Sequence, residues 1–141
     1  MAADAVTVAR NAPRKLAFRR QTKAHPVEGI DDPNIAICAL AQAFIELDNL
    51  PTAEQRSRLD KMLRKRCSPA EAEEIQVLGR WLVAQCGTPE AAIAKLSRRL
   101  YKIDGSASWA ALQDILMALV GDVLSPRQAD AVAEMKRAIL R

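Results

Sequence analysis

The sequence has a single histidine, His25, and only three cysteines, which are widely spaced. One histidine excludes a histidine-based catalytic triad and a multi-histidine metal site within this chain. The cysteines lack the paired short spacing of zinc and redox motifs, and their odd number fits a reducing compartment better than a disulfide framework. We expect Cys38 and Cys86, in apolar stretches, to be buried, and Cys67, next to Arg66, to be the one thiol with a lowered pKa.

Glycine and aromatic residues are also scarce. The five glycines form no phosphate-binding loop. Aromatic residues make up 4% of the chain although 50% is hydrophobic, and the abundance of Ala, Leu, Arg, Glu and Gln is typical of amphipathic helices rather than sheets. No run approaches the roughly 18 apolar residues of a membrane span, and the basic N-terminus lacks the apolar run of a secretory signal. We expect an all-helical, soluble, cytoplasmic protein without a membrane span.

Positive charge is concentrated at the N-terminus. Residues 1–24 carry six basic residues and only Asp4, a charge of +5, so the remainder of a chain with net charge +4 is at −1. The proline, glycine and aspartates between His25 and Pro33 are typical of a loop. We therefore interpret residues 1–30 as a basic, mostly disordered tail and residues 31–141 as one helical domain. The tail either solubilises the protein or contacts an anionic partner, and the candidate contacts are Arg14, Lys15, Arg19 and Arg20.

Six helices are indicated by the residues at their N-termini. Ser, Thr or Asp caps are followed by proline at the first helical position or by a Gln or Glu three residues later, so helices are expected to begin near residues 33, 52, 68, 88, 106 and 125. The short connections favour a compact all-α bundle of about six or seven helices. Trp81 and Trp109 are expected in the core, and the inward residues of the last helix are expected to be Ala129, Val132, Met135 and Ile139.

Two of the expected helical hairpins share a turn pattern. The segments 48–55 and 121–128 each place a short polar turn before a hydroxyl cap, with a Gln three residues after the cap. Capping boxes are common at the N-termini of unrelated helices, so the similarity is explained equally well without any relation between the two hairpins. If the two hairpins are related, their positions at opposite ends of the domain indicate a pseudo-twofold arrangement.

The repeated turn resembles that of the TerB-like family, which includes tellurite-resistance proteins and the N-terminal domain of a membrane-anchored J-domain co-chaperone. The family's turn is Asp, Gly, any residue, an aliphatic residue, Ser or Thr, two further residues and Glu. The resemblance covers roughly residues 33–141 and implies an all-helical bundle with two related hairpins. The matching positions are Asp48, Asn49, Leu50, Pro51, Thr52 and Gln55 in the first copy and Gly121, Asp122, Val123, Leu124, Ser125 and Gln128 in the second.

The resemblance also implies a divalent cation held by the acidic turns, for which Asp48 and Asp122 are the candidate ligands. The chain departs from the family at Asn49, at the reversed order of Gly121 and Asp122, and at the glutamines that replace Glu. Because hard cations prefer several charged oxygen ligands, ordinary turn roles explain the two aspartates equally well. No other cofactor is expected.

No catalytic site is expected, since the serines lie mostly at helix caps and no paired carboxylates share an apolar pocket. The resemblance implies a non-catalytic protein-interaction module of a bacterial stress-response, tellurite-resistance-like type. The alternative is nucleic-acid binding by the tail and a basic helix, to which Arg98, Arg99 and Lys102 would add if the helices are adjacent. The basic residues of that helix are Arg56, Arg58, Lys61, Arg64, Lys65 and Arg66.

Overall fold

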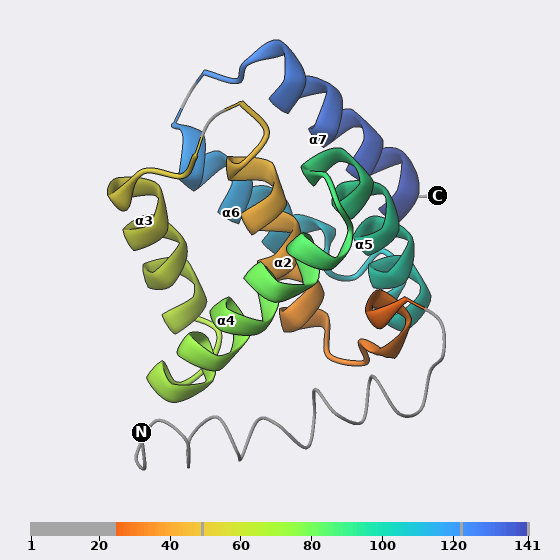
Figure 1. The fold of residues 1–141 in the computed structure, drawn as a ribbon, viewed down its shortest axis with the longest axis horizontal. Helices are drawn as coiled ribbons and strands as arrows, with labels where there is room; N and C mark the ends of the chain where they lie inside the picture. Colours follow the sequence, from red (N-terminus) through yellow and green to blue (C-terminus); the bar gives the residue numbers. More distant parts are fainter. Residues whose placement is uncertain (1–24, 49, 122, 141) are drawn as a thin grey trace.

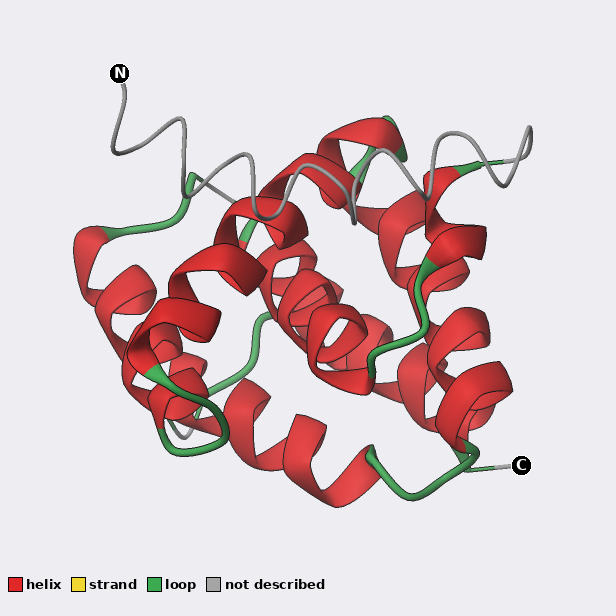
Figure 2. Ribbon diagram, turned by 90° about the horizontal axis from the view of Figure 1, so that it is seen from below, coloured by secondary structure: helices red, strands yellow, loops and turns green. Residues whose placement is uncertain are grey.

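The computed structural model describes residues 25–48, 50–121 and 123–140. These residues form only helices and connecting loops, which confirms the all-α prediction (Figures 1 and 2). No helix among them is both long and apolar enough to cross a membrane. The elements are a 3-10 turn η1 (Pro26–Gly29) and the helices α2 (Pro33–Ile45), α3 (Ala53–Arg64), α4 (Pro69–Gln85), α5 (Pro89–Asp104), α6 (Trp109–Val120) and α7 (Pro126–Ile139).

Helix α2 lies at the centre of the bundle, and α4 and α5 pack most extensively against it (Figure 1). Every residue from Ile35 to Ile45 is buried, so α2 has no solvent-exposed face over this stretch. The one amide side chain in the stretch, Gln42, donates a hydrogen bond to Glu46 Oε2 at 2.6 Å, which satisfies a polar group that would be costly to bury alone. The core is therefore organised around one completely covered helix.

The predicted N-terminal caps are confirmed for five helices. Asp32, Thr52, Ser68, Thr88 and Ser125 each accept a hydrogen bond from a backbone N–H of the helix that follows. The exception is α6, because Ser108 makes no cap bond and its hydroxyl donates to Asp104 instead. Helix α5 extends to Asp104, and α6 begins at Trp109.

Residues 25–30, which the sequence pattern assigns to the tail, belong to the packed fold. Val27 and Ile30 are buried, and Arg99 Nε of α5 donates to the Ile30 carbonyl oxygen at 2.7 Å. His25 Nδ1 accepts from the Val27 amide, and its Nε2 donates to the Gln85 carbonyl oxygen at 2.9 Å. The single histidine thus joins η1 to the end of α4.

Two expectations for the core differ from the structure. Ala129 is exposed and Ala131 is buried in its place, beside Met135 and Ile139. Trp109 is buried as expected, whereas Trp81 is half-buried. The contact of α7 is mainly with α5, so its buried face is set by one neighbouring helix.

Gly79 marks a close approach between α2 and α4. A Cβ atom at this position would lie 3.3 Å from Cys38 Sγ and 3.4 Å from the Ala39 backbone nitrogen. We expect Gly79→Val to lower the free energy of unfolding by about 1–3 kcal/mol, because the added methyl groups overpack this contact. Urea unfolding followed by circular dichroism measures the change. Ala84→Val, at an exposed position of the same helix, is the control and should cost less than about 1 kcal/mol; equal losses would contradict the close approach.

Candidate functional site

The two loops with related sequences meet at one end of the bundle. Asp48 lies in the α2–α3 loop and Ser125 in the α6–α7 loop, and the Ser125 hydroxyl donates to Asp48 Oδ2 at 2.5 Å. Both capping boxes are formed, with reciprocal bonds between cap and Gln at the starts of α3 and α7. The two similar turns therefore lie side by side, each followed directly by a capped helix.

An apolar side chain projects from each of these loops. Leu50 is 86% exposed and Val123 is 78% exposed, more than any other large hydrophobic residue in the described parts of the chain. A hollow of about 340 Å³ lies beside Val123 and is lined by residues of α3, the end of α6 and the start of α7, namely Thr52, Glu54, Gln55, Arg58, Leu119, Val120, Val123 and Gln128. We call this region the paired-loop surface and define it by Leu50, Thr52, Gln55, Val123 and Gln128.

The candidate cation ligands are only partly placed. Asp48 is exposed and accepts the Ser125 bond, while Asp122 lies outside the described residues. Glu54, the next acidic residue along the chain, forms an ion pair with Arg58. The described residues contain no group of three or more His, Cys, Asp or Glu that could hold a metal ion. Cation binding thus stays a prediction, which calorimetry with calcium, zinc and manganese tests.

The basic residues of α3 lie among carboxylates. Glu54 pairs with Arg58 one turn later, and Asp60 pairs with Arg64 at 2.7 Å. Hydrogen bonds from Arg64 and Gln76 lower the pKa of Asp60. This helix therefore balances part of its own charge, an arrangement that stabilises helices. The remaining predicted contacts of α3 are exposed, namely Arg56, Lys61, Lys65 and Arg66, and those of the tail lie outside the described residues, namely Arg14, Lys15, Arg19 and Arg20.

Helix α5 carries a second basic cluster with different surroundings. Lys95, Arg98, Arg99 and Lys102 are spaced by three and four residues, which places them on one face, and no acidic residue lies at these spacings from any of them. Such like-charge pairs destabilise a helix by about 0.2–0.5 kcal/mol each. Together with Glu28 of η1 they line a hollow of about 220 Å³, which we call the α5 basic hollow.

The two basic clusters do not form one surface. In Figure 1, α3 and α5 lie on opposite sides of α2, so Arg98, Arg99 and Lys102 do not extend the basic face of α3. Adjacent helices, the condition under which the α5 residues would add to that face, are not found. The sequence analysis did not name Lys95, although its spacing from Arg98 and Arg99 indicates a shared helical face. Nothing in the sequence indicated that Glu28 would line the same hollow.

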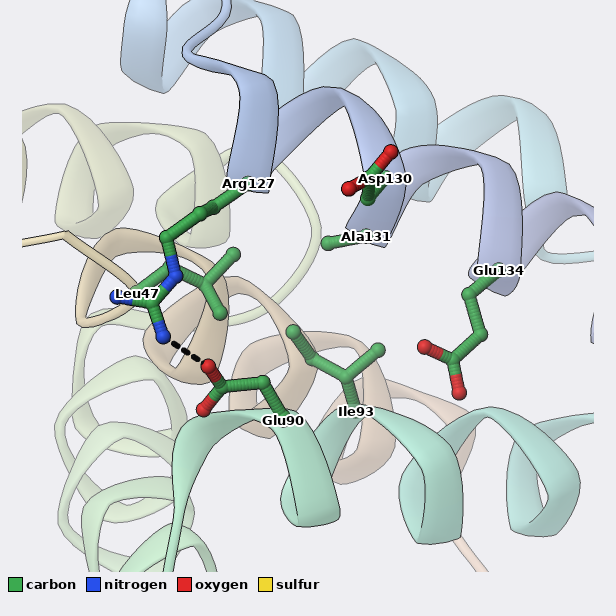
Figure 3. A pocket seen from close by; sticks show the side chains of 7 residues that line it. All are labelled: Leu47, Glu90, Ile93, Arg127, Asp130, Ala131 and Glu134. Atoms are coloured by element: carbon green, nitrogen blue, oxygen red, sulfur yellow. Dashed lines mark hydrogen bonds and ion pairs between the residues drawn. The ribbon is translucent and has the colours of Figure 1, made fainter.

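A third hollow, of about 190 Å³, lies between α5 and α7 (Figure 3). Leu47, Ile93 and Ala131 provide its apolar lining. The ion pair between Glu90 and Arg127 joins the two helices at one end. The backbone amide of Glu90 itself and the guanidinium of Arg127 lower the pKa of the Glu90 carboxyl. The ion pair accounts for Glu90 and Arg127, and the carboxylates of Asp130 and Glu134 also line the hollow.

The cysteines have thiol pKa values above the ordinary range. Burial raises the pKa of Cys38 to about 12 and also raises that of Cys86. The expected lowering at Cys67 is wrong, because burial and the nearby carboxylate of Glu71 raise its pKa more than Arg66 lowers it. No reactive thiolate is favoured at any of the three positions.

No protein-family model, curated protein or solved structure matches this chain. Functional inference therefore depends on the surfaces described above. The paired-loop surface carries two exposed apolar side chains beside two capped helix starts, and the α5 basic hollow is lined by four cations and one carboxylate, Glu28.

The Asp48–Ser125 hydrogen bond gives a test of loop pairing. We expect Asp48→Ala to lower the free energy of unfolding by about 0.5–1.5 kcal/mol and Ser125→Ala by about 1–2 kcal/mol, because the serine also caps α7. The double variant should lose less than the sum, with a coupling of at least about 0.5 kcal/mol in urea unfolding. Thr88→Ala, which removes the cap of α5, is the control and should add to Asp48→Ala without coupling. Simple additivity for Ser125 would show that the loops are not joined.

Proposed function

We propose that this protein is a non-catalytic interaction module that binds a protein partner through the paired-loop surface. The observation that carries the proposal is the exposure of Leu50 and Val123 in two loops joined by the Asp48–Ser125 hydrogen bond. Most other large apolar side chains in the described residues, such as Phe44 and Leu40, are packed in the core, and the two further exposed ones, Val77 and Leu140, are less exposed than Leu50 and Val123. Covering an exposed aliphatic side chain of this size is worth about 1.5–3 kcal/mol, so a partner that covers both gains substantial affinity.

The composition of the surface supports this proposal. Protein interfaces typically have an apolar centre and a polar rim, and here Thr52, Gln55 and Gln128 line the same hollow as Val123. The capping boxes hold Thr52 and Ser125 at the starts of α3 and α7, so these two residues would lose little conformational freedom when a partner binds. A bacterial stress-response role of the tellurite-resistance type is part of the proposal and depends on the resemblance of the turns alone.

Nucleic-acid binding by the basic tail and α3 is the alternative. The carboxylates beside Arg58 and Arg64 weaken the field of α3, and the basic residues of α5 lie on the other side of α2. The exposed basic residues of α3 and the charge of the tail favour the alternative, because positive charges of this kind suit contacts with phosphate groups. Micromolar binding of duplex DNA or RNA that weakens steeply with salt would give the alternative precedence.

Leu50→Ser combined with Val123→Ser tests the proposed interface. Proteins captured from cell extract by the wild-type chain are identified, purified and titrated against each variant by calorimetry. We expect affinity for the true partner to fall at least about tenfold in the double variant, because two apolar side chains no longer leave water on binding. Folding should be unaffected, since both residues are exposed in loops.

Val77→Ser combined with Leu140→Ser is the matched control, since it also removes two exposed large hydrophobic residues, 45% and 42% exposed, from other parts of the surface. The control should bind the partner as the wild type does. Equal weakening by both double variants, or a purified partner that binds the Leu50/Val123 variant normally, would overturn the proposed interface.

A further inference from the structure

We propose that the α5 basic hollow binds a compact anion that carries two or more phosphate groups. This inference is independent of the paired-loop surface and of any protein partner. It rests on the four cations of α5, which lie on one helical face around a concave site of about 220 Å³. Cations that share a helical face with no acidic residue one turn away on that helix repel one another, and a bound anion relieves that repulsion.

The ion pairs and hydrogen bonds of the four cationic side chains favour a bound ligand. Among the described residues, no ion pair is formed by Lys95, Arg98 or Lys102, whereas Arg58 and Arg64 of α3 each have a carboxylate one turn away. Arg99 differs from the other three because its Nε donates to the Ile30 carbonyl oxygen. That bond fixes the guanidinium at the hollow and leaves its terminal nitrogens to donate elsewhere, and guanidinium groups match phosphate oxygens well.

The size and charge of the hollow define the class of ligand. Lys95 and Lys102 are separated by about 10 Å along the helix axis, a span that suits a chain of two or three phosphate groups. The lining has four positive residues and one negative residue, so an anion with about three negative charges would balance it. No aromatic or aliphatic residue lines the hollow, which leaves the phosphates as the recognised groups. A nucleic-acid duplex instead presents its phosphates over an extended surface.

Glu28 gives the proposal a distinctive consequence. This carboxylate faces the four cations from η1 and would repel a bound anion. The turn itself is held in place by the Ile30 and His25 hydrogen bonds and by the burial of Val27, so replacing the Glu28 side chain should leave the turn intact. Removal of this one negative charge is therefore expected to strengthen binding rather than weaken it.

Calorimetry and thermal unfolding with sodium tripolyphosphate, ATP and orthophosphate test the site on the full chain. We expect tripolyphosphate to bind more tightly than orthophosphate and to stabilise the fold. Lys95→Gln combined with Lys102→Gln should weaken tripolyphosphate binding at least about tenfold, because two charge-assisted contacts are lost. The matched control, Lys61→Gln on α3 with Lys65→Gln at its C-terminal cap, makes the same change in net charge and should alter affinity less than about twofold. Glu28→Gln should bind more tightly than the wild type.

The other possible outcomes of these titrations either support or overturn the phosphate site. Equal affinities for tripolyphosphate and ATP would identify the phosphates as the whole of the recognised group, and tighter binding of ATP would identify a nucleotide as their source; both support the proposal. Absence of tripolyphosphate binding, equal weakening by the two lysine pairs, or weaker binding by Glu28→Gln would overturn it. Much tighter binding of duplex DNA through Lys95 and Lys102, with a steep salt dependence, would also overturn it and identify a polymer surface.

Discussion

The complete burial of α2 is the constraint on which the rest of the structure depends. Eleven consecutive residues, Ile35–Ile45, are buried, so neighbouring helices must cover every side of this helix. α4 and α5 provide most of the cover, and α3 and α6 add to it. At Gly79 the cover is so close that a side chain would press on Cys38 and Ala39. Each outer helix uses one face for this purpose, which leaves the opposite faces and the loops for recognition.

Features that depend on residues close together in sequence were predictable. A cap and its Gln partner lie three residues apart, so Thr52 and Ser125 identified the starts of α3 and α7 correctly. The position of η1 was not predictable, because Val27 and Ile30 are single apolar residues in a segment rich in loop formers, and their burial depends on contacts with α4 and α5. The full burial of α2 likewise depends on helices distant in sequence.

The candidate surfaces also combine features that the sequence predicts with features that depend on the tertiary structure. The repeated turn pattern drew attention to Asp48 and Ser125, but only the fold shows that the two side chains bond to each other. The number of basic residues pointed to α3 and the two residues after it, because the segment from Arg56 to Arg66 contains six of them. The sequence of α5 already shows that its cations have no acid one turn away; the shape of the hollow and the approach of Glu28 needed the tertiary structure.

Helix α2 also connects the two proposed binding regions. Its N-terminus follows η1, which contributes Glu28 to the α5 basic hollow, and its C-terminus leads into the loop that carries Asp48 and Leu50. A helix that is packed on all sides cannot shift without opening cavities in the core, and such cavities are costly. The two regions are therefore held at a fixed separation by the core. Substitutions at exposed residues of one region should leave the other intact, so the protein interface and the phosphate site stand or fall separately.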